Sequence, residues 1–152
     1  MDITIMNTLN EAKITFTSRS ANESFARVAV SSFFASLDPT VDEITDIKTA
    51  VSEAVTNSIV HGYRNTIGTI YITLRVLSDN IAYIKIRDNG CGISDIKQAM
   101  EPLYTTAPNE ERAGLGFAVM QSFMDRVRVF SVQDKGTTVV LTKKLSSRGN
   151  NG

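Results

Sequence analysis

The stretch SEAVTNSIVHG, residues 52–62, lies in a helical pattern and carries polar side chains along one line. Apolar residues recur every three or four positions, as the buried stripe of a helix requires; they are Ile44, Ile47, Val51, Val55 and Ile59. The same spacing aligns Glu53, Asn57 and His61 on an adjacent face, because residues three and four apart are neighbours on a helix. Such side chains more often lie on a solvated face. The rest of the chain must therefore decide their role.

The helix that carries this stretch has a recognisable beginning and end. Thr40 and Glu43 have the spacing of a capping box, which predicts that the helix begins near Thr40. Glycine commonly takes the left-handed conformation that ends a helix. We therefore expect the helix to run to about Val60 and to end with Gly62 in that conformation.

An earlier helix is predicted by the same signals. Ser20 and Glu23 repeat the capping-box spacing, and an apolar stripe follows them. The predicted stripe is Phe25, Val28, Ala29, Phe33 and Phe34. Glu23 and Arg27 lie off the stripe, four residues apart. As a surface ion pair they would contribute at most about 0.5 kcal/mol.

Alternating patterns predict strands and place a carboxylate on a buried face. Residues 13–18 read as a short edge strand, and residues 68–76 and 82–88 as a hairpin around Ser78-Asp79-Asn80. In the second arm Asp88 is in phase with Ile84 and Ile86. A carboxylate directed at an apolar layer is costly without a partner, so something must bind it. Gly90 and Gly92 follow, and they fit a tight turn as well as a close approach by a ligand.

The last third of the chain combines an unpatterned segment with a second glycine pair. Residues 101–113 show no periodicity and contain two prolines, which is typical of a functional lid or a disordered segment. Gly114 and Gly116 then begin an apolar helix that ends near Asp125. A glycine-rich helix N-terminus is a ready anion site, because free amide donors point outward there. Residues 127–132 and 137–145 predict a final hairpin.

Composition limits the classes of protein that fit. The chain of 152 residues, 42% of them hydrophobic, predicts one globular domain over residues 1–152. Its 16 basic and 16 acidic residues cancel, so neither direct nucleic-acid binding nor an anionic membrane is expected. There is no apolar run long enough to span a membrane and no signal-peptide pattern, so we expect a cytoplasmic protein. The single cysteine, Cys91, excludes an internal disulfide.

In chain order these features resemble a known set. The set consists of Glu-x-x-x-Asn on a helix, Asp-x-Gly-x-Gly after a strand, a lid, Gly-x-Gly and a late Gly-Thr-Thr at 136–138. Together these motifs resemble the ATP-binding fold of DNA gyrase, the Hsp90 chaperone, histidine kinases and MutL. The resemblance covers about residues 12–145. Three stretches closely resemble the sporulation anti-sigma F factors, which are serine kinases. They are SRSANESFARV (18–28), LDPTVDEITDIKTAVSEAVTNSIVHGY (37–63) and PLYTTAPNEERAGLGF (102–117).

This resemblance implies a fold and roles for individual residues. The fold is α+β, a two-layer α/β sandwich with a mixed, mostly antiparallel sheet of about five strands covered on one face by helices. Asn57 would bind Mg2+, Asp88 would accept a hydrogen bond from the adenine amino group, and Glu53 would be the general base. The remaining residues expected to bind ATP are Gly90, Gly92, Thr105, Thr106, Arg112, Gly114, Gly116 and Thr137.

The resemblance also implies partners. These are a sigma factor of the sigma F type and an anti-anti-sigma factor, whose serine would be phosphorylated with ADP as the product. Glu23 and Arg27 match positions that contact these partners in the family, and a homodimer is expected. Three alternatives remain: an anti-sigma kinase of the general stress response, a binding-only anti-sigma module with nucleotide as a structural ligand, and a histidine-kinase fragment. Two observations speak against the last: the only histidine, His61, closes the Glu53 helix, and no separate dimerisation helix is available to carry a phosphoacceptor.

Overall fold

The structure is a computed structural model that describes residues 7–100 and 108–146, with only the backbone of residues 97, 98 and 108–113. Its strands are β1 (Thr8–Thr17), β2 (Thr69–Leu77), β3 (Ile81–Asp88), β4 (Arg126–Val132) and β5 (Gly136–Lys144). Its helices are α1 (Ala21–Phe34), α2 (Val41–Asn57), α3 (Ile96–Met100) and α4 (Pro108–Phe123), with a 3-10 turn, η2 (Ala35–Leu37), and a π-helix, η3 (Ser58–Gly62). In the part of the chain described, no helix is long and apolar enough to cross a membrane.

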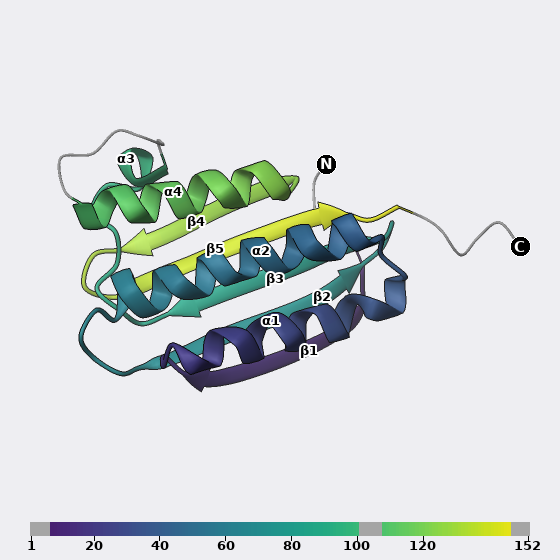
Figure 1. The fold of residues 1–152 in the computed structure, drawn as a ribbon, viewed down its shortest axis with the longest axis horizontal. Helices are drawn as coiled ribbons and strands as arrows, with labels where there is room; N and C mark the ends of the chain where they lie inside the picture. Colours follow the sequence, from purple (N-terminus) through teal and green to yellow (C-terminus); the bar gives the residue numbers. More distant parts are fainter. Residues whose placement is uncertain (1–6, 101–107, 147–152) are drawn as a thin grey trace, which may run out of the picture.

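The strands form one sheet in the order β1-β2-β3-β5-β4, and the helices cover one of its faces (Figure 1). This confirms the predicted α+β sandwich and its five strands. All four strand pairs among the described residues are antiparallel, so the mixed character expected of the sheet is absent from them. Strands β3 and β4 run in the same direction, but β5 lies between them. The edge position of β1 is also confirmed, although β1 is longer than expected.

Helix α2 begins as the sequence predicts. Thr40 Oγ1 accepts a hydrogen bond from the Glu43 amide at 3.0 Å, and the Thr40 amide donates to Glu43 Oε1 at 2.8 Å, which is a complete capping box. The buried stripe contains Ile47, Ala50, Val51, Ala54 and Val55. Ile44 and Ile59, at the two ends of the predicted stripe, are only partly buried.

The end of this helix differs from the prediction. After Asn57 the backbone continues as η3, in which the Tyr63 amide donates to the Ser58 carbonyl at 2.9 Å, a five-residue turn. Gly62 is not left-handed, and the first positive φ after the helix is at Arg64, with φ of 54°. The helix ends in a wider π turn, so the chain leaves it without a left-handed residue at Gly62. The predicted glycine cap was therefore wrong.

Helix α1 buries only part of the predicted stripe: Phe34 is buried and Phe33 packs against the core, but Phe25 and Val28 do not lie in it. Its buried residues are Ala26, Val30 and Phe34, whereas Phe25 is 51% and Val28 62% exposed. Ala26 and Val30, which the prediction did not include, are buried in their place. Ser20 is in the helical conformation and makes no cap hydrogen bond, so the predicted capping box is absent at this helix.

The β2–β3 hairpin brings the predicted carboxylate into the core. Asp79 and Asn80 have φ of 68° and 58°, the pair of left-handed residues that a two-residue hairpin requires. On β3, Ile84, Ile86 and Asp88 are all at most 3% exposed, as their shared phase predicts. The opposite face of the sheet carries both charged and apolar side chains, among them the exposed Phe130. There the Arg87 guanidinium lies 4.0 Å from the centre of the Tyr71 ring.

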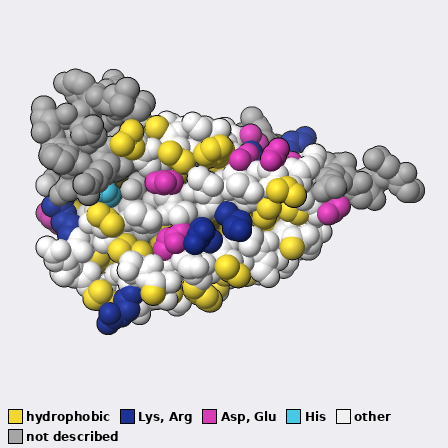
Figure 2. All heavy atoms as spheres, viewed as in Figure 1, with side chains coloured by type: hydrophobic (Ala, Val, Ile, Leu, Met, Phe, Trp, Pro, Cys, Tyr) yellow, Lys and Arg dark blue, Asp and Glu magenta, His cyan; other side chains and the backbone are white. Residues whose placement is uncertain are grey.

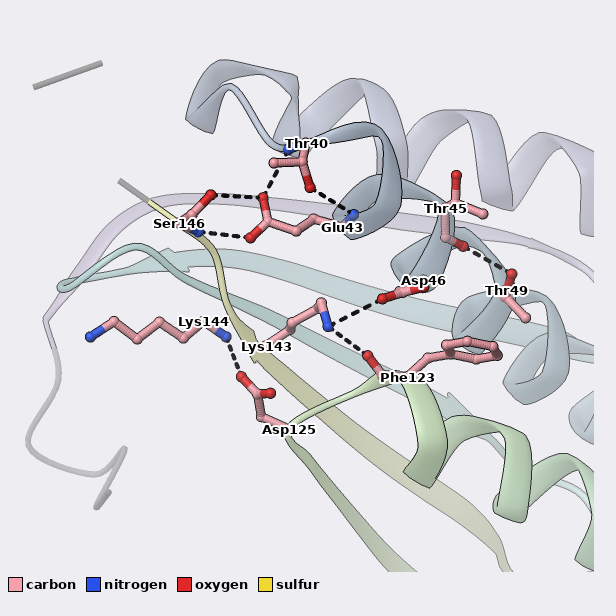
Figure 3. A network of polar contacts seen from close by, with 10 residues as sticks. All are labelled: Thr40, Glu43, Thr45, Asp46, Thr49, Phe123, Asp125, Lys143, Lys144 and Ser146. Carbon is pink, nitrogen blue, oxygen red and sulfur yellow. Dashed lines mark hydrogen bonds and ion pairs between the residues drawn. The ribbon is translucent and has the colours of Figure 1, made fainter. Parts of the chain in front are cut away.

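The N-terminus of α2 is also tied to the end of the last strand, through Glu43 (Figure 3). Glu43 Oε2 accepts from the Ser146 amide at 2.8 Å, and Oε1 accepts from the Ser146 hydroxyl at 3.2 Å. Partial burial acts to raise the pKa of Glu43, but the hydrogen bonds from Thr40 and Ser146 outweigh it and lower the pKa. Glu43 therefore stabilises the fold as a carboxylate.

Replacing Glu43 with glutamine should lower the free energy of unfolding by about 1 kcal/mol at pH 7, because an amide NH2 cannot accept from Ser146. Since the folded-state pKa is lowered, this stabilisation is present above the unfolded pKa of about 4.3 and is lost as pH falls through the folded-state value. Urea unfolding of both proteins at pH 7 and pH 3 measures the difference. Asp42→Asn, on the same turn but exposed, is the control. A difference that persists undiminished at pH 3 would contradict this role.

Candidate functional site

Glu53 and Asn57 lie side by side against α4. A Cβ atom on Gly116 would lie 3.1 Å from Asn57 Nδ2, 3.2 Å from Asn57 Oδ1 and 3.2 Å from Glu53 Oε2. The polar line predicted on α2 is therefore not a free solvated face, because both side chains are partly buried beside the α4 backbone. A side chain at residue 116 would push into both groups. This contact explains why a glycine suits that position of the helix.

The Asn57 amide has a donor that the described residues leave unsatisfied. Its Nδ2 atom is buried and has no hydrogen-bond partner among the described residues. An unsatisfied buried donor costs about 1–3 kcal/mol, and a bound ligand can remove that cost. No group of three or more His, Cys, Asp or Glu residues in the described part of the chain could hold a metal. A metal at Asn57 would need water and phosphate oxygens as its other ligands, which is how Mg2+ usually binds.

Asp88 lies at the end of β3 and is 3% exposed. The Ser58 hydroxyl donates to Oδ2 at 2.8 Å, and the amides of Gly90 and Thr137 donate to Oδ1 at 2.9 and 3.3 Å. The protein itself thus supplies three of the hydrogen-bond donors that the buried carboxylate requires. Burial raises the pKa of Asp88, although these three hydrogen bonds act in the opposite direction.

One acceptor position on Asp88 remains open. A carboxylate offers about four acceptor positions, and the three donors within the protein leave one of them on Oδ2. A Cβ atom on Gly62 would lie 3.0 Å from this same oxygen, a tight contact that the glycine avoids. Oδ2 could therefore accept one more hydrogen bond, from an N–H or O–H donor.

The glycines after Asp88 are required by the packing of the chain itself. A Cβ atom on Gly90 would lie 2.3 Å from the Gly62 carbonyl oxygen, and one on Gly92 would lie 2.3 Å from the Val132 carbonyl oxygen. Gly92 also has a φ of 75°. Both distances exclude any side chain. The tight-turn interpretation of this pair is therefore sufficient, and the two residues hold the end of η3 and the β4–β5 turn beside Asp88.

Thr137 of the late Gly-Thr-Thr motif lies beside Asp88. It pairs with Asp88 across the β3–β5 ladder, and its hydroxyl lies 2.9 Å from the Ser131 hydroxyl. Ser131 also accepts a hydrogen bond from the Ile93 amide at 2.7 Å. These hydrogen bonds of Ser131 and Thr137 hold the β4–β5 hairpin next to Asp88.

The structure leaves part of the predicted lid undescribed and corrects the start of α4. Thr105 and Thr106 lie outside the described residues, and of Arg112 only the backbone is described. Helix α4 begins at Pro108, six residues before the predicted start at Gly114. Proline is favoured in the first helical turn because its φ is already helical. Gly114 and Gly116 consequently lie inside α4, where amides donate to the preceding turn, so in this structure they do not form an open helix N-terminus.

Glu23 and Arg27 lie on α1, on the other side of α2 from α4 (Figure 1). Arg27 Nε is 2.8 Å from Glu23 Oε1, which confirms the predicted pair four residues apart. Glu23 Oε1 also accepts a hydrogen bond from the Ser52 hydroxyl of α2, a contact that the sequence did not reveal. Acidic and basic side chains are interspersed over this helix-covered face of the molecule (Figure 2).

The fold and this site define a histidine kinase-like ATPase domain, and the chain matches that family over residues 16–143. It is 55% identical over 138 residues to the anti-sigma F factor of Bacillus licheniformis, covering 90% of this chain and 94% of the relative. It is also 54% identical to the anti-sigma F factor of Clostridium novyi, covering 91% and 96%. The chain therefore belongs to the anti-sigma F factor family.

Solved structures support the same fold. The RsbU and RsbW domains of a Mycobacterium tuberculosis protein match with a TM-score of 0.68 at 21% identity, over 91% of this chain and 32% of that one. A blue-light activated histidine kinase of Erythrobacter litoralis matches with a TM-score of 0.58 at 20% identity, over 85% and 42%. At these identities the likeness concerns the fold alone.

Proposed function

We propose that the protein is an anti-sigma factor and a protein-serine kinase that acts in the cytoplasm. The observation that carries the proposal is the placement of Glu53 and Asn57 against Gly116, with Asp88 beyond the end of the same helix. This arrangement offers a carboxylate, a free amide and an open acceptor on one side of α2. The names of the curated relatives from Bacillus licheniformis, Bacillus subtilis and Clostridium novyi, each an anti-sigma F factor, support it.

Binding of Mg2+ and ATP would divide between two ends of the site. Asp88 would accept a hydrogen bond from the adenine amino group at its open position, with Thr137 beside it. Asn57 would hold Mg2+ through its side-chain oxygen. Bound Mg-ATP supplies the phosphoryl group to be transferred. Gly90, Gly92, Gly114, Gly116, Thr105, Thr106 and Arg112 would complete the nucleotide site, as the family resemblance implies.

Glu53 would orient the serine hydroxyl of a protein substrate and accept its proton. Phosphoryl transfer depends mainly on positioning and on charge neutralisation, so one carboxylate near the acceptor is sufficient. A binding-only module would not need a carboxylate at this position. The proximity of Glu53 Oε2 to Asn57, through the space beside Gly116, therefore favours the kinase over that alternative.

The partners follow from the family. We propose that a sigma factor of the sigma F type is held inactive, and that an anti-anti-sigma factor is the phosphorylated substrate, with exchange between them set by ATP and ADP. A homodimer is proposed on the same basis. A general-stress sigma partner is the alternative, and residues 18–28, which resemble the sporulation type, argue for sigma F.

Mass spectrometry of a candidate anti-anti-sigma factor tests the chemistry. After incubation with this protein and Mg-ATP, one serine of the candidate should carry a phosphate, and omission of Mg2+ should prevent this. Phosphohistidine on His61 of the protein itself, with no phosphoserine on the candidate, would instead support a histidine kinase.

Arg27→Glu should abolish binding of the sigma factor without unfolding the protein. A central interface arginine commonly contributes 2 kcal/mol or more, so we expect affinity to fall by about 30-fold or more. The half-exposed Arg27 has a side-chain exposure of 39%, so the fold should tolerate the change. Fluorescence anisotropy with labelled sigma factor measures binding, and Lys135→Glu, an exposed turn residue, is the matched charge control. If Arg27→Glu bound the sigma factor as tightly as Lys135→Glu, Arg27 would not be part of the interface.

A further inference from the structure

Two adjacent residues of α2 contact different neighbouring helices. Glu53 Oε2 lies beside Gly116 of α4, while the Ser52 hydroxyl donates to Glu23 Oε1 of α1. Helix α2 lies between these two helices (Figure 1). A displacement of α2 caused by a ligand at Glu53 and Asn57 therefore also displaces Ser52 relative to α1.

The oxygen that Ser52 contacts is shared. Glu23 Oε1 receives the Ser52 hydrogen bond and also lies 2.8 Å from Arg27 Nε. Arg27 Nε is buried, yet the contact lacks the alignment of a hydrogen bond, and no other partner is found among the described residues. Ser52 thus holds the Glu23 carboxylate in a position that leaves the arginine N–H unsatisfied. Loss of the Ser52 bond would let the carboxylate turn toward Arg27.

The contact between the two helices is close enough to transmit such a change. Ala26 and Val30 of α1 are completely buried, and Ser52 itself is partly buried. Glu23 has a side-chain exposure of only 21%, so its carboxylate has few alternative positions in water. A packed interface of this kind responds to displacement by exchanging one set of polar contacts for another.

We infer that Ser52 is a positioning residue that couples the nucleotide site to the docking surface around Arg27. The nucleotide-dependent position of α2 sets the Ser52–Glu23 hydrogen bond, and this bond sets the arrangement of the Glu23–Arg27 pair that meets the sigma factor. The inference rests on the proposed function. Because coupling between two sites is reciprocal, sigma binding should change nucleotide affinity by the same factor.

The test compares sigma affinity in the Mg-ATP and Mg-ADP forms of wild type, Ser52→Ala, Ser52→Thr and Thr49→Ala. Thr49 is the control because, among the described residues, its hydroxyl bonds to the Thr45 carbonyl of its own helix, at 2.9 Å, and to no other helix. We expect the ratio of the two affinities to fall to within twofold of unity in Ser52→Ala. Ser52→Thr, which keeps a hydroxyl, should recover the wild-type ratio, as should Thr49→Ala. The ATP affinity without sigma factor should stay within twofold in all four proteins.

The outcomes separate the inference from the proposed function. A wild-type ratio in Ser52→Ala, or a loss of its ATP affinity by more than twofold, overturns the coupling role. A wild-type protein that binds sigma factor equally in both nucleotide states also overturns it, because there is then no coupling to transmit. A wild-type protein that binds neither ATP nor a sigma factor overturns the proposed function itself.

Discussion

Asp88→Asn should abolish ATP binding and leave the protein folded. The asparagine Oδ1 can still accept from the amides of Gly90 and Thr137, and the Ser58 hydroxyl can rotate to accept from the new NH2 group. The open acceptor position, however, becomes a donor that would face the donor amino group of adenine. A site built to hydrogen-bond a ligand discriminates strongly against a mismatch of this kind, so we expect affinity to fall by about 100-fold or more.

The stability of this variant provides a check on the fold. Burial raises the pKa of Asp88, so its contribution to stability is fully present below the unfolded pKa of about 3.9 and is lost as pH rises through the folded-state pKa. Burial disfavours the ionised form of Asp88, and asparagine carries no charge at any pH. Calorimetric ATP titration and thermal unfolding at pH 7 should therefore show lost binding with a melting temperature that does not fall. Asp134→Asn, in an exposed turn, is the control. Unchanged ATP affinity in Asp88→Asn would exclude the proposed adenine contact.

Glu53→Ala should retain ATP binding and lose phosphoryl transfer. Removal of a general base typically slows a reaction by about 10²- to 10⁴-fold, whereas the adenine contact lies at the other end of the site. Single-turnover transfer to the anti-anti-sigma substrate measures the rate, and calorimetric titration measures ATP affinity. Glu53→Gln keeps the shape of the side chain beside Gly116 and separates lost charge from lost packing.

The matched control for Glu53 is Asp42→Ala, an exposed carboxylate on the same helix. It should transfer phosphate at the wild-type rate. If Glu53→Ala transferred phosphate as fast as this control, Glu53 would not be the general base. The argument from Glu53 against a binding-only module would then fail. If it lost ATP binding instead, the carboxylate would be part of the nucleotide site and its role in transfer would need another test.

Local signals made the α2 and β3 parts of the site predictable from the sequence. The capping box at Thr40 sets the beginning of α2, and the helical period then places Glu53 beside Asn57. The period of two along β3 places Asp88 on the buried face. In each case the decisive pattern lies within about twenty residues of chain, and tertiary packing agrees with it.

The parts that failed depend on contacts between distant segments. Ser58 reaches Asp88, 30 residues away, through a π turn that leaves no hydrophobic period in the sequence. Ala26 and Val30 lie on the buried face of α1, whereas a count of large apolar residues favours Phe25 and Val28, which are exposed. Glu23 has the spacing of a capping residue, but its carboxylate is taken by Ser52, 29 residues away.

The central claim is that α2, the end of β3 and α4 together form one ATP site. Amide chemical-shift mapping of the wild-type protein during titration with Mg-ATP tests it most directly. The account predicts that the largest shifts fall at Glu53, Asn57, Asp88, Gly116 and Thr137, with little change at the amides of Glu11 and Arg75, whose side chains form an ion pair on the far face of the sheet. Saturable shifts that left Asn57 and Asp88 unmoved and fell on the far face would contradict it.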